Sequence, residues 1–170
     1  SAFIDFIHSL QLDISGADIS FAAPLSFDAE IKKGDIRVSD MFNLYNYENM
    51  LYVMKLSGKE IKDFLEESYY MWTNQMKSPE NHLLWFKKKP REGAEDRASF
   101  QNFSFNFDSA SGIIYTVDVT KPKGEKITIT SMADGSPFRM DKIYKVALNS
   151  YRGNGGGELL TKGSGIPQED

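Results

Sequence analysis

The chain has 170 residues, a formal net charge of -4 and 13% aromatic residues, with no cysteine and two histidines. This length is typical of one domain, which buries roughly 70% of the surface that its unfolded chain exposes. The lack of cysteine excludes disulfides, thiolate nucleophiles and cysteine-based metal centres. The acidic balance argues against a protein that binds duplex DNA, and no stretch approaches the roughly 20 apolar residues of a membrane helix.

The first part of the chain alternates between helical and extended patterns. Apolar residues recur at helical spacing over residues 2–10, and the alternating segment 18–23 ends at Pro24, which predicts a strand. Ser39 is placed to cap a short helix that runs through Leu44. We therefore expect a helix, a strand and a second, shorter helix in this order.

A further strand is expected over residues 50–56, and the best-defined helix follows it. Ser57 and Glu60 have the spacing of a capping box, in which each side chain accepts a hydrogen bond from the other residue's backbone N–H. The helix should be about 15–20 residues long, because apolar side chains mark one face of it: Ile61, Phe64, Leu65, Met71 and Trp72. Residues 74–100 are polar, charged and interrupted by prolines, which predicts a loop excursion.

The rest of the chain has mostly strand patterns. Extended segments are expected over 103–107, 113–119, 127–129 and 143–148, with a hairpin turn at 133–136. The expected helices lie in the first half of the chain and most of the expected strands in the second, without a regular βαβ alternation. The sequence therefore predicts an α+β domain.

The two histidines do not indicate a catalytic centre. A two-metal centre needs several histidines and carboxylates that converge, and His8 and His82 stand far apart in the sequence. Neither has an evident nucleophile at a strand–helix turn, so no Ser/His/Asp triad can be assembled. We interpret His82 as a surface or packing residue, and we expect little bond-breaking chemistry in this chain.

Residues 152–157 contain four glycines in six positions. Such a loop brings its backbone close to a ligand or exposes a cluster of N–H groups, although it lacks the Lys-Ser/Thr ending of a P-loop. A glycine-rich turn between a strand and a helix is the alternative interpretation. Tyr151 precedes the loop at the end of the predicted strand, where its ring can project into a cleft.

Phe105 and Phe107 would share one face of the strand predicted over 103–107. An aromatic stripe on a strand usually belongs to the core, but Phe107 is followed at once by the turn-forming residues 108–112. Phe107 and Tyr151 are therefore candidates to clamp a flat heterocycle. Stacking a base on one aromatic ring contributes about 1–3 kcal/mol and tolerates any base, which suits a promiscuous nucleotide site.

Four motifs carry a family resemblance. The first half of the chain contains Gly34-Asp-Ile-Arg-Val-Ser-Asp-Met-Phe-Asn-Leu-Tyr-Asn-Tyr-Glu-Asn-Met-Leu51 and Met54-Lys-Leu-Ser-Gly-Lys-Glu-Ile-Lys-Asp-Phe-Leu-Glu66. The second half contains Phe105-Asn-Phe-Asp-Ser-Ala-Ser-Gly-Ile-Ile-Tyr115 and Tyr144-Lys-Val-Ala-Leu-Asn-Ser-Tyr-Arg-Gly-Asn-Gly-Gly-Gly157. In this order they resemble the C-terminal domain of the bacterial 5′-nucleotidase and 2′,3′-cyclic-nucleotide 2′-phosphodiesterase family. Residues 22–24 and 44–51 are more similar to the cyclic-phosphodiesterase branch.

The resemblance implies a 5′-nucleotidase C-terminal-domain-like fold, a mixed sheet packed with helices, with residues 1–170 as a single nucleotide-binding, substrate-specificity domain. In such domains the base lies between two aromatic rings. The resemblance places Tyr151 at one ring position and Phe107 at the other, with Phe105 as the alternative. The glycine loop would shape the site beside the ring, and these residues would line it: Arg152, Gly153, Asn154, Gly155 and Gly156.

The same resemblance implies that the catalytic residues and two divalent metals belong to an N-terminal metallophosphoesterase domain, which no segment of this chain matches. We therefore expect no catalytic residue, metal or cofactor in this chain, and hydrolysis of nucleotide phosphate esters, in nucleotide catabolism, only by the intact protein. The expected partners are a nucleotide or nucleoside and the N-terminal domain in cis, without nucleic acid or a membrane span. The expected location is the periplasm or the cell surface.

Two departures concern the sugar and phosphate contacts. The 5′-nucleotidase branch has an Asn-Gly-Gly-Gly-Ile-Arg segment near the place of residues 22–27, and it often has an acid in the glycine loop where this chain has Gly157.

The alternative function is a stand-alone, non-catalytic ligand-binding or interaction domain of the same fold. A third, the binding of single-stranded nucleic acid by the aromatic residues, is disfavoured by the acidic charge.

Overall fold

The computed structural model describes residues 2–25, 30–31, 33–87 and 100–168. Parts of two segments discussed above, residues 26–27 and residues 88–99 of the expected loop excursion, lie outside the described residues. The elements in chain order are α1 (Ala2–Ser15), β1 (Ile19–Ala22), α2 (Val38–Leu44), β2 (Leu51–Ser57), α3 (Gly58–Trp72), the 3-10 helix η2 (Ser104–Asn106), β3 (Ser109–Ser111), β4 (Ile113–Val117), β5 (Ile127–Met132), β6 (Ile143–Asn149), α4 (Ser150–Gly153), the 3-10 helix η3 (Gly156–Glu158) and the π-helix η4 (Leu159–Gly163).

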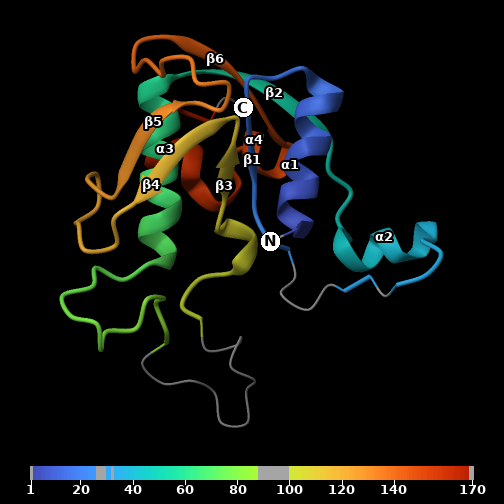
Figure 1. Ribbon diagram of the computed structural model, residues 1–170, viewed down its shortest axis with the longest axis horizontal. Helices are drawn as coiled ribbons and strands as arrows, with labels where there is room; N and C mark the ends of the chain where they lie inside the picture. Colours follow the sequence, from blue (N-terminus) through green and yellow to red (C-terminus); the bar gives the residue numbers. More distant parts are fainter. Residues whose placement is uncertain (1, 26–29, 32, 88–99, 169–170) are drawn as a thin grey trace.

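The strands form a mixed four-stranded sheet and a separate pair. The sheet has the order β2-β6-β1-β3, in which β6 is antiparallel to β2 and parallel to β1, and β1 is antiparallel to β3. The strands β4 and β5 form a two-stranded antiparallel pair beside α3, while α1 lies on the other side of β1 (Figure 1). The predicted α+β architecture with a mixed sheet is confirmed.

The core lies between the four-stranded sheet and α3. All four residues of β1 are buried, because the strand is central and is covered by helices. The ring of Phe21 in β1 stacks on that of Phe64 in α3, with centroids 4.1 Å apart and planes 4° from parallel. Other fully buried apolar side chains surround this pair: Ile19, Leu56, Ile61, Leu65, Tyr144, Val146, Leu148 and Leu159.

The junction of β2 and α3 follows the capping box predicted from the sequence. The backbone N–H of Glu60 donates to Ser57 Oγ at 3.2 Å, and the Ser57 N–H donates to the Glu60 carboxylate at 2.7 Å. These two bonds satisfy backbone donors that the first turn of a helix leaves without partners. The helix runs from Gly58 to Trp72, which confirms the predicted length.

Local patterns misled the prediction in three places. The segment 103–107 is not a strand, since Ser104–Asn106 is a 3-10 helix closed by hydrogen bonds from the N–H groups of Asn106 and Phe107. Ser39 is not a cap, because α2 begins at Val38 and its N-cap residue is Arg37, whose backbone N–H donates to the Asp40 carboxylate at 2.7 Å.

The third error concerns the pairing of the last strands. Residues 133–136 do form a turn, closed by a 2.9 Å bond from the Met132 N–H to the Ser136 carbonyl. However, β5 pairs with β4, whereas β6 enters the other sheet between β2 and β1. The turn is therefore not a hairpin.

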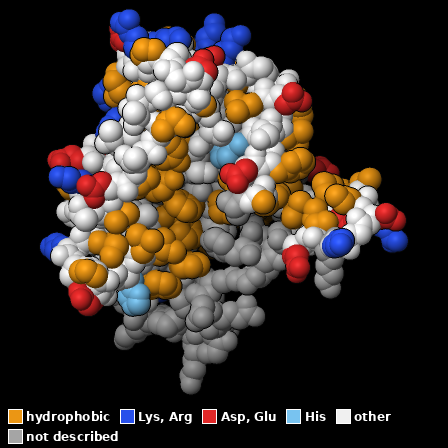
Figure 2. Space-filling model, in the orientation of Figure 1, with side chains coloured by type: hydrophobic (Ala, Val, Ile, Leu, Met, Phe, Trp, Pro, Cys, Tyr) orange, Lys and Arg blue, Asp and Glu red, His pale blue; other side chains and the backbone are white. Residues whose placement is uncertain are grey.

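Hydrophobic side chains gather on the surface over α1 and α2, where Phe6, Ile14 and Phe42 are exposed (Figure 2). Among the described residues, no helix combines the length and the apolar character needed to cross a bilayer. The described part of 74–100 contains isolated bridges, such as that between Phe86 and Phe100.

Candidate functional site

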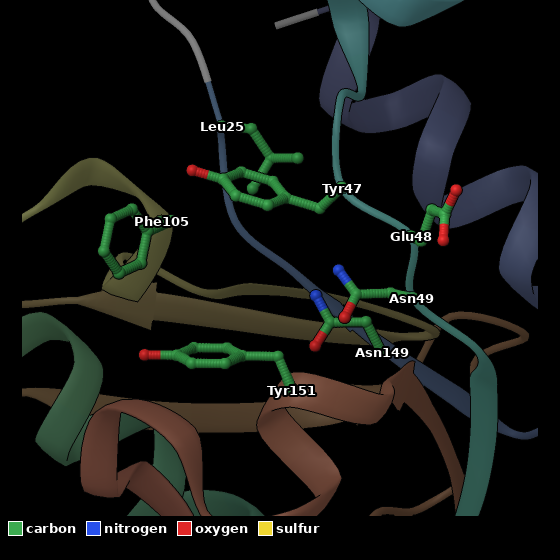
Figure 3. A pocket seen from close by; sticks show the side chains of 7 residues that line it. All are labelled: Leu25, Tyr47, Glu48, Asn49, Phe105, Asn149 and Tyr151. Atoms are coloured by element: carbon green, nitrogen blue, oxygen red, sulfur yellow. The ribbon is translucent and has the colours of Figure 1, made fainter.

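A pocket of about 250 Å³ opens at one edge of the four-stranded sheet (Figure 3). Its lining comes from four segments: Leu25 after β1; Tyr47, Glu48 and Asn49 before β2; Phe105 in η2; and Asn149 and Tyr151 at the end of β6 and in α4. The parallel strands β1 and β6 end at this edge, and their antiparallel neighbours β2 and β3 begin there. The sheet topology thus brings together residues that lie far apart in the sequence.

Two tyrosine rings lie on opposite sides of the pocket. Figure 3 shows the rings of Tyr47 and Tyr151 nearly edge-on, one above the other, with open space between them. Both side chains are partly exposed, at 52% and 42%. Phe105 closes one end of this space, and its ring stands 84° to that of Tyr151 with centroids 6.1 Å apart. The geometry therefore provides two facing rings and one perpendicular wall.

Phe107, the first choice for the second ring, does not line this pocket. Its ring packs on Tyr69 and Trp72 of α3, at centroid distances of 5.2 Å and 5.3 Å. The cause is the 3-10 turn of η2, because residues on such a turn do not share a face at a spacing of two. The alternative residue, Phe105, is the one that the structure places beside Tyr151.

Arg152 is buried behind the pocket and does not point into it. Only 2% of the residue is exposed. Its Nε and Nη2 donate to the two carboxylate oxygens of Asp108 at 2.9 Å and 2.8 Å, and Nη2 also donates to the Phe105 carbonyl at 2.9 Å. A further bond joins Nη1 to the Gly156 carbonyl. Arg152 therefore fastens η2 to the glycine loop and holds the Phe105 wall beside Tyr151.

The electrostatics of this pair are dominated by its burial. Burial raises the pKa of the Asp108 carboxyl, and the Arg152 guanidinium acts in the opposite direction. A bidentate pair of this kind matches the planar fork of arginine to both carboxylate oxygens. The pair serves as a structural clamp within the fold.

The glycine loop supports the site from behind. A Cβ atom at Gly156 would lie 2.5 Å from the Tyr151 carbonyl oxygen and 2.6 Å from its ring, so only glycine lets the loop pack this closely. Gly153, Asn154 and Gly155 line a different cavity, of about 600 Å³, together with residues near the C-terminal end of the described chain. None of the four loop residues predicted to touch a ligand, from Gly153 to Gly156, lines the pocket beside Tyr151.

Sequence reasoning missed Tyr47, Asn49 and Asn149. The pairing of β2 with β6 places Leu51 opposite Asn149, so the residues before β2 lie beside those after β6. The amide nitrogens of Asn49 and Asn149 both donate to the Tyr45 hydroxyl, at 2.9 Å and 3.3 Å. Pairing the two strands in this register would have revealed the group, because Asn149 ends β6 while Tyr47 and Asn49 lie in the segment just before β2.

Among the residues that the structure describes, neither histidine belongs to a group of metal ligands. His8 is buried and bonded to the hydroxyls of Ser20 and Ser109 at 2.9 Å and 3.2 Å, and burial lowers its pKa to about 4. His82 is exposed, and its ring meets the edge of Phe86. Within the described ranges, no three His, Cys, Asp or Glu side chains converge as metal ligands would. The two divalent metals that the family resemblance implies are expected in the N-terminal metallophosphoesterase domain and not among these residues.

The chain is similar to curated nucleotide phosphoesterases. It is 32% identical over 144 residues to the trifunctional nucleotide phosphoesterase protein YfkN of Bacillus subtilis (strain 168), covering 78% of this chain and 9% of that protein. It is also 32% identical over 145 residues to a 2′,3′-cyclic-nucleotide 2′-phosphodiesterase/3′-nucleotidase of Salmonella typhimurium, covering 78% of this chain and 20% of the relative. The chain thus spans a fifth or less of the length of these relatives.

Solved structures agree with the fold. A protein of Staphylococcus aureus assigned as a 5′-nucleotidase superposes with a TM-score of 0.72 at 25% identity, covering 99% of this chain and 30% of that one. A 5′-nucleotidase precursor of Thermus thermophilus gives 0.64 at 23% identity, covering 94% and 27%. The family model of the 5′-nucleotidase C-terminal domain matches residues 1–162. Since this match spans nearly the whole chain, the chain belongs to the 5′-nucleotidase C-terminal domain family.

Proposed function

We propose that this chain is the nucleotide-binding domain of a nucleotide phosphoesterase, and that it holds the base between the rings of Tyr47 and Tyr151. The observation that carries this proposal is the open space between two facing tyrosine rings (Figure 3). Flat heterocycles stack on aromatic faces with about 1–3 kcal/mol per ring, whatever the base. Phe105 stands perpendicular to Tyr151, so it bounds the bound base at its edge and does not stack on it.

The names of the relatives support the hydrolytic role of the intact protein. Both curated relatives are nucleotide phosphoesterases and are several times longer than this chain. On this proposal, the chain binds and orients the nucleotide, and a metallophosphoesterase domain in cis supplies the metals and cleaves the phosphate ester. No catalytic step is assigned to the described residues, and the chain alone should bind nucleotides weakly without hydrolysing them. On the family resemblance, we place the intact protein in the periplasm or at the cell surface.

Calorimetric titration of the purified chain with adenosine and 3′-AMP tests the sandwich. Tyr47→Ala and Tyr151→Ala should each weaken binding by roughly five- to 150-fold, the loss of one stacking face. Tyr70→Ala is the matched control, since Tyr70 is 45% exposed on α3 and does not line the pocket. It should leave the affinity unchanged.

The same titrations separate the alternatives. The absence of saturable binding at millimolar ligand would refute the nucleotide site and favour a stand-alone interaction domain. Phe107→Ala should lower the stability of the chain, because its ring packs on Trp72, and should spare the affinity of the folded fraction. A large loss of affinity in that folded fraction would instead support Phe107 as the second ring.

A further inference from the structure

The aromatic wall of the pocket continues outward from Phe105. The ring of Phe103 stacks on that of Phe105, with centroids 5.1 Å apart and planes 7° from parallel. Phe105 in turn stands edge-to-face with Tyr151, and both of these residues line the pocket. Tyr151, Phe105 and Phe103 therefore form an unbroken series of ring contacts, here called the aromatic track, which begins in the pocket and ends outside it.

The outer end of the aromatic track is exposed. Phe103 is 70% exposed, although one face of its ring is covered by Phe105. The exposed area therefore lies mainly on the opposite face of the ring. Phe107, from the same segment, instead packs on Tyr69 and Trp72 of α3. The Phe103 side chain thus adds little to the core, and it presents a flat apolar face to solvent beside the pocket.

The aromatic track leaves the pocket at a definite end. Figure 3 shows Phe105 at the end toward which the hydroxyl groups of Tyr47 and Tyr151 point, whereas Asn49 and Asn149 lie at the other end. The two tyrosine rings bound the space between these ends from opposite sides. A ligand that extends out of this space past the edge of Phe105 reaches Phe103 next.

We propose that the outer face of Phe103 is a second stacking subsite, and that the chain binds a dinucleotide with one base between Tyr47 and Tyr151 and the other base on Phe103. The proposal rests on the stacking site of the proposed function. Neighbouring bases of a single strand can be splayed apart and stacked on separate aromatic rings, and such stacking tolerates any base. The net charge of -4 disfavours a long polyanion, so the ligand is a short one with two bases.

Two ligands that differ only in the second nucleoside measure this subsite. Adenylyl-(3′→5′)-adenosine and the methyl ester of 3′-AMP share the first nucleoside and a phosphate diester of the same charge. In calorimetric titrations, the purified chain should bind the dinucleotide at least about fivefold more tightly than the methyl ester, the lower limit for stacking one base on one ring. The corresponding trinucleotide should bind no more tightly than the dinucleotide.

Substitutions of Phe103 separate stacking from other effects of this side chain. Phe103→Ala should remove the preference for the dinucleotide and leave the affinity for the methyl ester unchanged. Phe103→Leu keeps an apolar side chain without a flat face and should also lose the preference, whereas Phe103→Trp should retain it. Phe42→Ala is the matched control, since Phe42 is 64% exposed on α2 and does not line the pocket. It should keep the wild-type ratio of affinities.

The outcomes are distinct. A wild-type chain that binds both ligands with equal affinity overturns the second subsite and leaves the stacking site between the tyrosines standing. Equal losses for both ligands in Phe103→Ala would show that Phe103 acts only by supporting Phe105, and would also overturn the subsite. An affinity that rises further with each added nucleotide would overturn the two-base site in favour of a nucleic-acid strand. If neither ligand binds, the proposed function fails together with this inference.

Discussion

Replacing Arg152 by methionine should destabilise the fold and disrupt the pocket together. The guanidinium and the Asp108 carboxylate are 3% and 5% exposed, and the variant leaves this carboxylate buried without its charge partner. Breaking a buried pair in this way costs about 3–5 kcal/mol of unfolding free energy. Protonation of Asp108 limits the cost, since neutralising a carboxyl with an ordinary pKa of 3.8 at pH 7 takes about 4 kcal/mol. The cost of breaking the pair and the upper limit set by protonation therefore agree, at about 4 kcal/mol.

Urea denaturation of wild type and Arg152→Met, followed by circular dichroism from pH 5 to 7, measures this cost. The pKa of the unpaired, buried Asp108 in the folded variant lies above its unfolded value, so the folded variant takes up a proton as the pH falls. Its unfolding free energy should then recover by up to about 1.4 kcal/mol per pH unit relative to wild type. Nucleoside affinity should fall as well, since the Phe105 carbonyl and the Gly156 carbonyl lose their shared donor.

Arg139→Met is the matched control for this substitution. Arg139 pairs with Asp141 on the surface, where the two side chains are 67% and 77% exposed, and such pairs contribute less than about 1 kcal/mol. The reasoning would be refuted by an Arg152→Met chain that is within about 1 kcal/mol of wild type at pH 7. A loss of stability that stays constant from pH 5 to 7 would refute the part assigned to the buried carboxylate.

Two further substitutions probe the core. His8 is bonded to Ser20, and burial lowers its pKa from 6.5 to about 4. About 3 kcal/mol of stability that is present above pH 6.5 should therefore be lost as the pH falls to 4. In denaturation of His8→Gln over this range, the unfolding free energy should change less steeply with pH than in wild type, and an equal pH dependence would contradict the assignment. Gly58→Ala places a Cβ against the Arg139 backbone carbonyl and should cost about 1–3 kcal/mol in thermal denaturation, whereas Lys59→Ala, one residue on and exposed, should stay within about 0.5 kcal/mol.

The parts of the fold that depend on local chemistry could be predicted from the sequence. The capping box of Ser57 and Glu60 needs only residues three positions apart, and the structure forms it as expected. The phenylalanines at 103, 105 and 107 also gave a local signal, but tertiary contacts override it. Arg152 binds the Phe105 carbonyl and the Asp108 carboxylate from a distant part of the chain, and this contact accompanies a 3-10 turn in place of a strand.

Tyr47, the proposed second stacking residue, was missed for a related reason. Tyr47 follows no periodic pattern, and its position becomes meaningful only when β2 is paired with β6. The pairing itself is encoded in β6, where Val146, Ala147 and Leu148 are buried in succession. Such a run indicates a central strand covered on both faces, whereas the turn at 133–136 suggested a hairpin partner. Long-range pairing, and not local propensity, decides which side chains meet in the pocket.

Four consecutive residues at the end of β6 connect the pocket to the core. Asn149 lines the pocket, the Ser150 hydroxyl donates to Asn49 Oδ1, Tyr151 supplies a ring and Arg152 fastens the Phe105 wall. They diverge because α4 begins at Ser150, and successive side chains on a helical turn point in different directions. Since β6 is bonded to strands on both sides, this half of the pocket is held by the core itself. Tyr47 stands outside that framework, and so Tyr47→Ala should weaken the proposed stacking without weakening the fold.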